Sequence, residues 1–239
     1  AEQKFISYCK EQGFVTEFIR YHYLYNDELK FSLECKNLEN RTVVLLDLTI
    51  DKDDIWMQQF SSTNRNLVRR LEKDEFQWKI KPFEKSDIKV FQKIYAETMS
   101  NASADDFYLF SDDFYLDLIN GLKNDIQICW VEKSDEIYAM SLLFTSGGIV
   151  TYFLSGRNIN YPKISATNFL LSEMAFWAKE NKCNLLNFGG GLSLSKDDRL
   201  FKFKQNFSKT EKSFYIGKRI HNIQAYESLI DEFIQKHGS

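Results

Sequence analysis

The chain has 239 residues, of which 44% are hydrophobic and 27% charged, an ordinary composition for a globular protein with one large or two small domains. Its formal net charge of -3 excludes a global electrostatic attraction to nucleic acid or to an anionic membrane, so an anion would have to be bound locally. The cysteines and histidines are scattered and form no Cys-x-x-Cys pair, so we expect reduced thiols, a cytoplasmic protein and no metal site.

The first third of the sequence predicts helices and strands in alternation. Apolar spacing over Phe5 to Gln12 predicts a helix that ends at Gly13, and Val15 to Tyr21 is typical of a strand. Arg41 to Leu48 is the strongest β-run of this region. From Asp53 to Leu71 apolar residues recur at helical spacing, which predicts one continuous helix with a cationic end.

The remaining two thirds predict a sheet with helices around it. Ile137 to Gly156 contains no charge and is nearly long enough to cross a membrane, but Ser146-Gly147-Gly148 at its middle predicts a hairpin of two buried strands. The other expected elements are strands over Phe76 to Pro82, Ile126 to Lys133 and Asn184 to Phe188, and helices over Ser86 to Met99, Asp112 to Lys123 and Ser165 to Asn181.

This order of elements predicts an α/β (α+β) fold. Three consecutive strands can pair antiparallel and a helical crossover leads to the last strand, which gives a mixed, mostly antiparallel sheet flanked by helices. We expect an N-terminal lobe over residues 1–75, a main domain over 76–217 and a C-terminal helical tail over 218–239. Ligands on such sheets bind where the strand order changes, here at Tyr152 beside Phe188.

The same place carries the most informative stretch of the sequence. Leu185 to Phe188 predicts a buried strand that runs into a turn of three glycines, and Arg199 to Phe207 then alternates lysines with phenylalanines. Glycine lets a ligand approach the backbone, and lysine supplies positive charge where an anion would lie. The residues equally allow a strand from which Lys202 and Lys204 project outward while the phenylalanines are core.

Taken together, these stretches resemble the Fem-type branch of the GNAT acyltransferases, which includes the peptidoglycan bridge-forming aminoacyltransferases. The resemblance extends over nearly the whole chain and depends on the order and spacing of its parts. The stretches that carry it are Glu17 to His22, Trp56 to Arg70, Glu97 to Met99, Tyr108 to Phe110, Tyr152 to Gly156, Asn168 to Leu171, Asn187 to Gly190 and Phe203 to Phe207.

The resemblance implies a GNAT-like fold with a partial N-terminal GNAT-like lobe, and an acyl transfer. An amine on an envelope, peptidoglycan or amino-sugar precursor would attack the carbonyl of an activated donor, either aminoacyl-tRNA or acyl-CoA. No permanently bound cofactor and no DNA partner are implied. Transfer RNA, and a peripheral association with the inner face of the membrane, are left open.

Lys204 is the expected catalytic residue, because the resemblance directs the lysine of the Phe203-Lys204 pair at the donor and at the developing negative charge. Several of the expected substrate-binding residues have a structural alternative, since a strand tyrosine fills a sheet face, an asparagine caps a helix and a helix-end arginine is solvated. The expected substrate-binding residues are Tyr152, Ser155, Asn168, Gly189, Gly190, Gly191, Phe203, Arg20 and Arg65.

The sequence departs from the family pattern in two places. Ser100 stands where the family usually has an arginine that holds a nucleotide-linked muropeptide phosphate, and the stretch from Gly156 to Pro162 has one glycine where acetyl-CoA enzymes have a glycine-rich phosphate loop. Two alternatives therefore stay open: an acyl-CoA-dependent sugar N-acyltransferase, and a catalytically silent GNAT-like domain that binds a partner or a cell-wall precursor.

Overall fold

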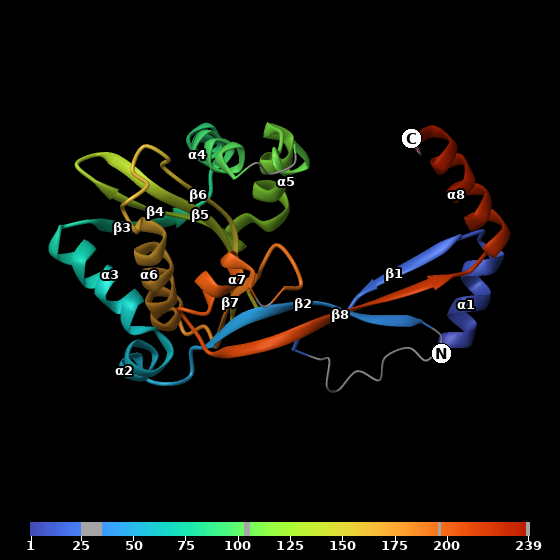
Figure 1. Cartoon of the computed structure of the whole chain (residues 1–239), viewed down its shortest axis with the longest axis horizontal. Helices are drawn as coiled ribbons and strands as arrows, with labels where there is room; N and C mark the ends of the chain where they lie inside the picture. Colours follow the sequence, from blue (N-terminus) through green and yellow to red (C-terminus); the bar gives the residue numbers. More distant parts are fainter. Residues whose placement is uncertain (25–34, 103–105, 196, 238–239) are drawn as a thin grey trace. The chain divides into compact units, whose positions relative to one another are not determined.

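The computed structural model describes residues 1–24, 35–102, 106–195 and 197–237 (Figure 1). The chain forms two compact units. One joins Ala1–Thr42 to Lys212–Ser239, and the other is Val43–Glu211.

The first unit is built from α1 (Glu2–Glu11), β1 (Thr16–Arg20), the beginning of β2 (Lys36–Asp47), most of β8 (Thr210–Ile220) and α8 (Ile223–His237). The strands β1 and β8 pair antiparallel with Glu17 opposite Arg219, and the Arg219 guanidinium lies 3.1 Å from the Glu17 carboxylate. The last strand was expected to end at Phe188, and a helical tail was expected from residue 218. Instead β8 extends to Ile220 and the last helix begins at Ile223.

The prediction of one continuous helix from Asp53 to Leu71 is wrong, because the helix is interrupted. The segment consists of α2 (Lys52–Asp54), a π-helical turn η1 (Ile55–Gln59) and α3 (Ser62–Lys73). Between them Phe60 and Ser61 are extended, with ψ of 132° and 152°. The Ser61 hydroxyl accepts a hydrogen bond from the Asn64 amide at 3.1 Å, so it caps a new helix and compensates for the break.

The sheet of the second unit is mixed and mostly antiparallel, as predicted. The pairs β2–β7, β3–β4, β4–β5 and β5–β6 are antiparallel, whereas β6–β7 is parallel and is connected by α6 (Ala166–Glu180). The hairpin between β5 and β6 is confirmed, and it turns at Gly147 and Gly148, which have φ of 57° and 78°. The strands are β3 (Gln77–Pro82), β4 (Ile126–Lys133), β5 (Glu136–Ser146), β6 (Ile149–Arg157) and β7 (Leu185–Gly190).

Helices cover both faces of this sheet (Figure 1). Alternation along β4 places Ile126 and Ile128 in a core with α4 (Ile88–Asn101) and α5 (Asp112–Leu122), and Cys129 and Val131 in a second core with α3 and α6. Short 3₁₀ turns lie at Lys85–Asp87, Asp106–Tyr108 and Lys123–Asp125. Among the residues that the structure describes, no helix is both long and apolar enough to cross a membrane.

The parallel pair β6–β7 is short, and this positions the site. Its last paired residues are Thr151 and Asn187. Beyond these residues β6 stays paired with β5, with a register shift between Ser141 and Leu143, whereas β7 stays paired with β2. The two central strands therefore stop sharing hydrogen bonds just before Tyr152 on β6, as expected for the place where the strand order changes.

Candidate functional site

The three glycines after Phe188 were expected to form a turn, but Gly189 and Gly190 belong to β7. Gly190 pairs with Val43 of β2, and a register shift leaves Phe188 as an extra residue on β7. Gly189 has φ of 76°, and its amide donates to the Asn187 side chain at 2.7 Å. The glycine is needed there because this backbone conformation is rarely adopted by other residues.

Lys204 lies at the end of a short helix, α7 (Arg199–Lys204), so the reading of this segment as a strand is wrong. Lys204 does not project into solvent, since only 6% of it is exposed. Its ammonium donates a 2.7 Å hydrogen bond to the Gly190 carbonyl oxygen and lies 5.6 Å from the centre of the Tyr152 ring. The structure thus brings Lys204, Tyr152, Gly189 and Gly190 together.

Burial changes the acid–base properties of both polar side chains in this group. Desolvation lowers the pKa of Lys204 to about 8, against an opposing effect from the Asp198 carboxylate. Burial raises the pKa of Tyr152 to about 12, so its hydroxyl stays neutral near physiological pH. Lys204 is thus mainly a cation at neutral pH, but its positive charge is only weakly solvated by water.

Aromatic side chains hold α7 on the sheet. The Phe207 ring is fully buried, with its centre 5.3 Å from that of Phe188 on β7 and 5.5 Å from that of Phe203. Phe203 packs against the core that contains α3 and α6. These contacts place the final turn of α7, and with it Lys204, beside β7.

The remaining predicted residues of the second unit are engaged in the fold. Ser155 donates to the Met140 carbonyl on β5 at 3.1 Å. The Asn168 amide donates to the Asn64 side chain at 2.9 Å, which ties α6 to α3. The Arg65 guanidinium donates to the main-chain carbonyls of Trp56 and Met57 in the π-helical turn and to that of Phe60, which follows it.

Arg20 belongs to the first unit. It is an exposed residue on β1, and its guanidinium carbon lies 5.1 Å from the centre of the Phe214 ring. This contact lies within the first unit, whereas Lys204 is part of the second.

Sequence reasoning missed Asp198, which precedes α7. Its carboxylate accepts hydrogen bonds from the amides of Phe201, Leu192 and Ser193 at 2.8 to 2.9 Å. Burial alone would raise the pKa of Asp198, but these hydrogen bonds outweigh it and hold the pKa below its usual value. The signal was present, because an aspartate three residues before Phe201 has the spacing of a helix N-cap.

Gly191, the third of the three glycines, lies against the Asp198 carboxylate. A β-carbon at Gly191 would lie 2.5 Å from the Asp198 carboxyl carbon, so no side chain fits there. This third glycine therefore serves close packing against Asp198.

The single glycine of the stretch after β6 also serves packing. A β-carbon on Gly156 would lie 2.8 Å from the Ile94 carbonyl oxygen of α4. Several amides of the following loop are already bonded inside the protein: Asn158 donates to Tyr138, Asn160 to the Asn158 side chain, and Ile164 to Tyr161. These amides are not free to bind a phosphate.

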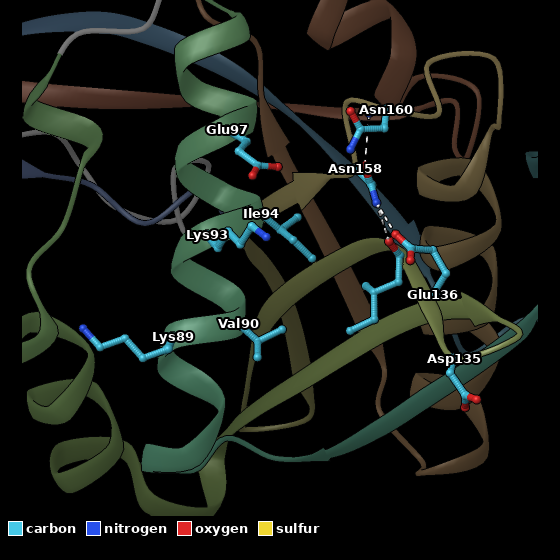
Figure 2. A pocket seen from close by; sticks show the side chains of 10 residues that line it. Lys89, Val90, Lys93, Ile94, Glu97, Asp135, Glu136, Asn158 and Asn160 are labelled. Carbon is cyan, nitrogen blue, oxygen red and sulfur yellow. Dashed lines mark hydrogen bonds between the residues drawn. The ribbon is translucent and has the colours of Figure 1, made fainter.

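A pocket of about 430 Å³ opens between α4 and the ends of β5 and β6 (Figure 2). Figure 2 shows Lys93 and Glu97 on its helical side and Asn158, hydrogen-bonded to Glu136, on its other side. The pocket has lining residues of both charges and includes no residue of the Lys204 group. This pocket is not among the sites predicted from the sequence.

No group of three or more His, Cys, Asp or Glu side chains that could hold a metal ion occurs in the part of the chain that the structure describes. The cysteines Cys9, Cys35, Cys129 and Cys183 are free and buried.

Comparison with known proteins identifies the family. Residues 59–204 match the acetyltransferase (GNAT) domain family, and this match spans more than half of the chain. The chain therefore belongs to the GNAT family and is an N-acyltransferase of that superfamily. No curated protein matches the sequence.

Solved structures of the Fem-like branch share the fold. FemX superposes with a TM-score of 0.66 at 12% identity, over 93% of this chain and 69% of that chain. L-PGS from Bacillus licheniformis gives 0.66 at 16% identity, over 91% and 72%. The C-terminal domain of a putative lysylphosphatidylglycerol synthetase from Agrobacterium fabrum gives 0.64 at 16%, over 98% and 76%. At such identities the likeness shows the fold alone.

Proposed function

We propose that this chain is a Fem-type aminoacyltransferase, which moves an aminoacyl group from an activated ester onto an amine of an envelope precursor. The observation that carries the proposal is the buried Lys204 ammonium, held on the Gly190 carbonyl beside Tyr152 where β6 and β7 stop pairing. A fixed cation in a site of low solvation is what acyl transfer needs at the carbonyl oxygen.

In the proposed reaction the neutral amine of the acceptor attacks the donor carbonyl carbon. A C–N bond forms as the carbonyl becomes an oxyanion, and collapse of this intermediate breaks the C–O bond to the donor. The proton lost by the amine is balanced by the proton gained by the departing oxygen, so the products are an amide and the free donor hydroxyl. Lys204 has three N–H donors, of which Gly190 takes one. A remaining donor can bind the oxyanion, and one such preorganised donor contributes about 3 to 4 kcal/mol to the transition state.

The loop after β6 favours an aminoacyl ester over coenzyme A as donor. Acetyl-CoA enzymes bind pyrophosphate with free amides of a glycine-rich loop at a helix N-terminus. Here Gly156 packs directly against the main chain of α4, and the amides of Asn158, Asn160 and Ile164 donate hydrogen bonds within the protein. Aminoacyl-tRNA, one of the two donors that the resemblance implies, does not require this motif.

The acceptor is proposed from the Fem-like resemblance and from the solved structures with the same fold. One of these proteins is described as a putative lysylphosphatidylglycerol synthetase, and the resemblance is to enzymes that modify peptidoglycan precursors. Ser100 replaces the family arginine for the muropeptide phosphate. We therefore propose an amine of an amino-sugar or peptide precursor, in the cytoplasm or at the inner face of the membrane.

A thermal-shift series with coenzyme A, acetyl-CoA, charged and uncharged tRNA and UDP-amino sugars tests the donor and the acceptor. A ligand at about 100 times its Kd adds about 2.7 kcal/mol of stability. Stabilisation by charged tRNA, with transfer of its aminoacyl group to an amine, supports the proposal. Stabilisation by coenzyme A alone would identify the acyl-CoA rival, and precursor binding without turnover on any donor would identify the silent domain.

A further inference from the structure

Asp198 is joined to both ends of the segment that separates β7 from α7. On one side its carboxylate binds the amides of Leu192 and Ser193 and the Ser193 hydroxyl, at 2.8, 2.8 and 3.1 Å. On the other side it caps α7 by accepting from the Phe201 amide at 2.9 Å. One carboxylate thus fixes the start of the helix relative to the turn that leaves β7.

This double attachment bears directly on Lys204. The turn at Leu192 follows Gly190, whose carbonyl oxygen holds the Lys204 ammonium, while the helix that Asp198 caps ends at Lys204 itself. Gly191 lies between them with no room for a side chain, because Asp198 fills the space. Both partners of the Lys204–Gly190 hydrogen bond are therefore placed through Asp198.

Asp198 also acts on Lys204 through its charge. It is 9% exposed, and its negative charge opposes the effect of burial on the Lys204 ammonium. The other titratable side chain at the ammonium is Tyr152, which contributes its ring face. The Asp198 carboxylate therefore favours the cationic form of Lys204 in this buried setting.

We propose that Asp198 is a positioning residue for acyl transfer, which sets the place and the charge of the Lys204 ammonium through α7 and the Leu192–Ser193 turn. This role deepens the proposed function and rests on it. Asp198 does not touch the reacting atoms. Its effect is transmitted entirely through Lys204 and the Gly190 carbonyl.

The test compares Asp198→Asn with Asp197→Asn in the full chain. Asp197 is the neighbouring carboxylate and pairs with the exposed Lys202 at 2.7 Å, so its substitution removes the same charge without touching Lys204. The ionisation of Lys204 is followed by NMR of 13C-labelled lysine between pH 6 and 10.5, and turnover is measured in parallel. Assignment of the signal comes from its loss in Lys204→Met.

We expect Asp198→Asn to move the Lys204 midpoint to lower pH and to reduce turnover at neutral pH by on the order of tenfold or more, as misplacement of a catalytic group does. Asp197→Asn should change neither. Asp198→Ser, which keeps a helix cap but no charge, should show the same shift of the midpoint. If Asp198→Asn fails to fold, Asp198→Ser and Gly191→Ala test the charge and the contact separately.

An unchanged Lys204 midpoint together with wild-type turnover in the Asp198 variants would overturn the inference, as would an equal effect of Asp197→Asn. The NMR readout needs no donor or acceptor. If the midpoint shifts while no donor supports turnover in the wild type, the proposed function fails and the link between Asp198 and Lys204 remains. If the wild type is active and the Asp198 variants are equally active, the positioning role fails alone.

Discussion

The Lys204 ammonium is joined to the Gly190 carbonyl oxygen by a 2.7 Å hydrogen bond between residues 14 positions apart. This contact closes the segment that leaves β7 at Gly190 and returns through α7, so the end of a strand and the end of a helix meet at one buried cation. A substitution at either residue is therefore expected to reduce turnover more than it reduces folding stability.

Replacing Lys204 by Met keeps the length and the packing of the side chain but removes the cation. We expect turnover to fall by on the order of 10²- to 10³-fold, the loss that follows removal of one oxyanion donor. Lys202→Met is the matched control, because Lys202 lies on the same helix but is exposed and pairs with Asp197. Steady-state kinetics of the two variants would refute the role of Lys204 if both kept wild-type rates.

The rate should decline as pH rises through about 8, because burial lowers the pKa of Lys204 to about 8 and the proposed active form is the cation. The acceptor amine becomes more reactive over the same range, so the decline must come from the enzyme. A pH–rate profile checks this, and a rate that keeps rising to pH 10 would contradict it.

The free energy of unfolding should rise with pH over the range in which the rate declines. The folded-state pKa of Lys204 is about 8 and the ordinary value is 10.5, so the unfolded chain binds more protons between these pH values. The cost of burying the cation is thus present below pH 8 and disappears as pH rises to 10.5. Relative to Lys204→Met, the wild-type free energy of unfolding should rise by on the order of 3 kcal/mol over this window, as measured by urea denaturation.

Gly156→Ala should destabilise the second unit, because its β-carbon would lie 2.8 Å from the Ile94 carbonyl oxygen and 2.9 Å from the Tyr95 Cα, both main-chain atoms of α4. Overpacking of this kind costs about 1 to 3 kcal/mol. Gly121→Ala is the control, since Gly121 lies in α5 with open space around it, and alanine there should stabilise by roughly 0.5 to 1 kcal/mol. Equal melting temperatures for the two variants would argue against the packing role of Gly156.

Asn168→Ala tests whether Asn168 binds a substrate or supports the fold. Its side chain donates to Asn64, which is 1% exposed and also donates to the Ser172 hydroxyl at 3.3 Å. Leaving a buried acceptor unpaired costs about 1 to 3 kcal/mol, so we expect a lower melting temperature with little change in kcat. A large loss of kcat with unchanged stability would restore the substrate-binding interpretation.

Much of the fold could be predicted from the sequence because local patterns decide it. The hairpin followed from two glycines between β-rich runs, and the crossover to β7 followed from the helical spacing after Ser165. The break at Phe60 and Ser61 could not be predicted from apolar spacing, since the period continues through it. Its cause includes the bond from the Ser61 amide to the Asn206 carbonyl, a residue far along the chain.

The candidate site shows the same division. The glycines, phenylalanines and lysines near β7 are recognisable in the sequence as a motif, so the sequence predicts where the proposed site lies, and its resemblance to the GNAT family is confirmed by the match over residues 59–204. Three features follow from long-range contacts instead: α7 is a helix, Lys204 rather than Lys202 is buried, and Asp198 holds both ends of the segment. The reason is physical: composition and spacing fix local preference, whereas desolvation and hydrogen-bond geometry depend on which distant residues surround a group.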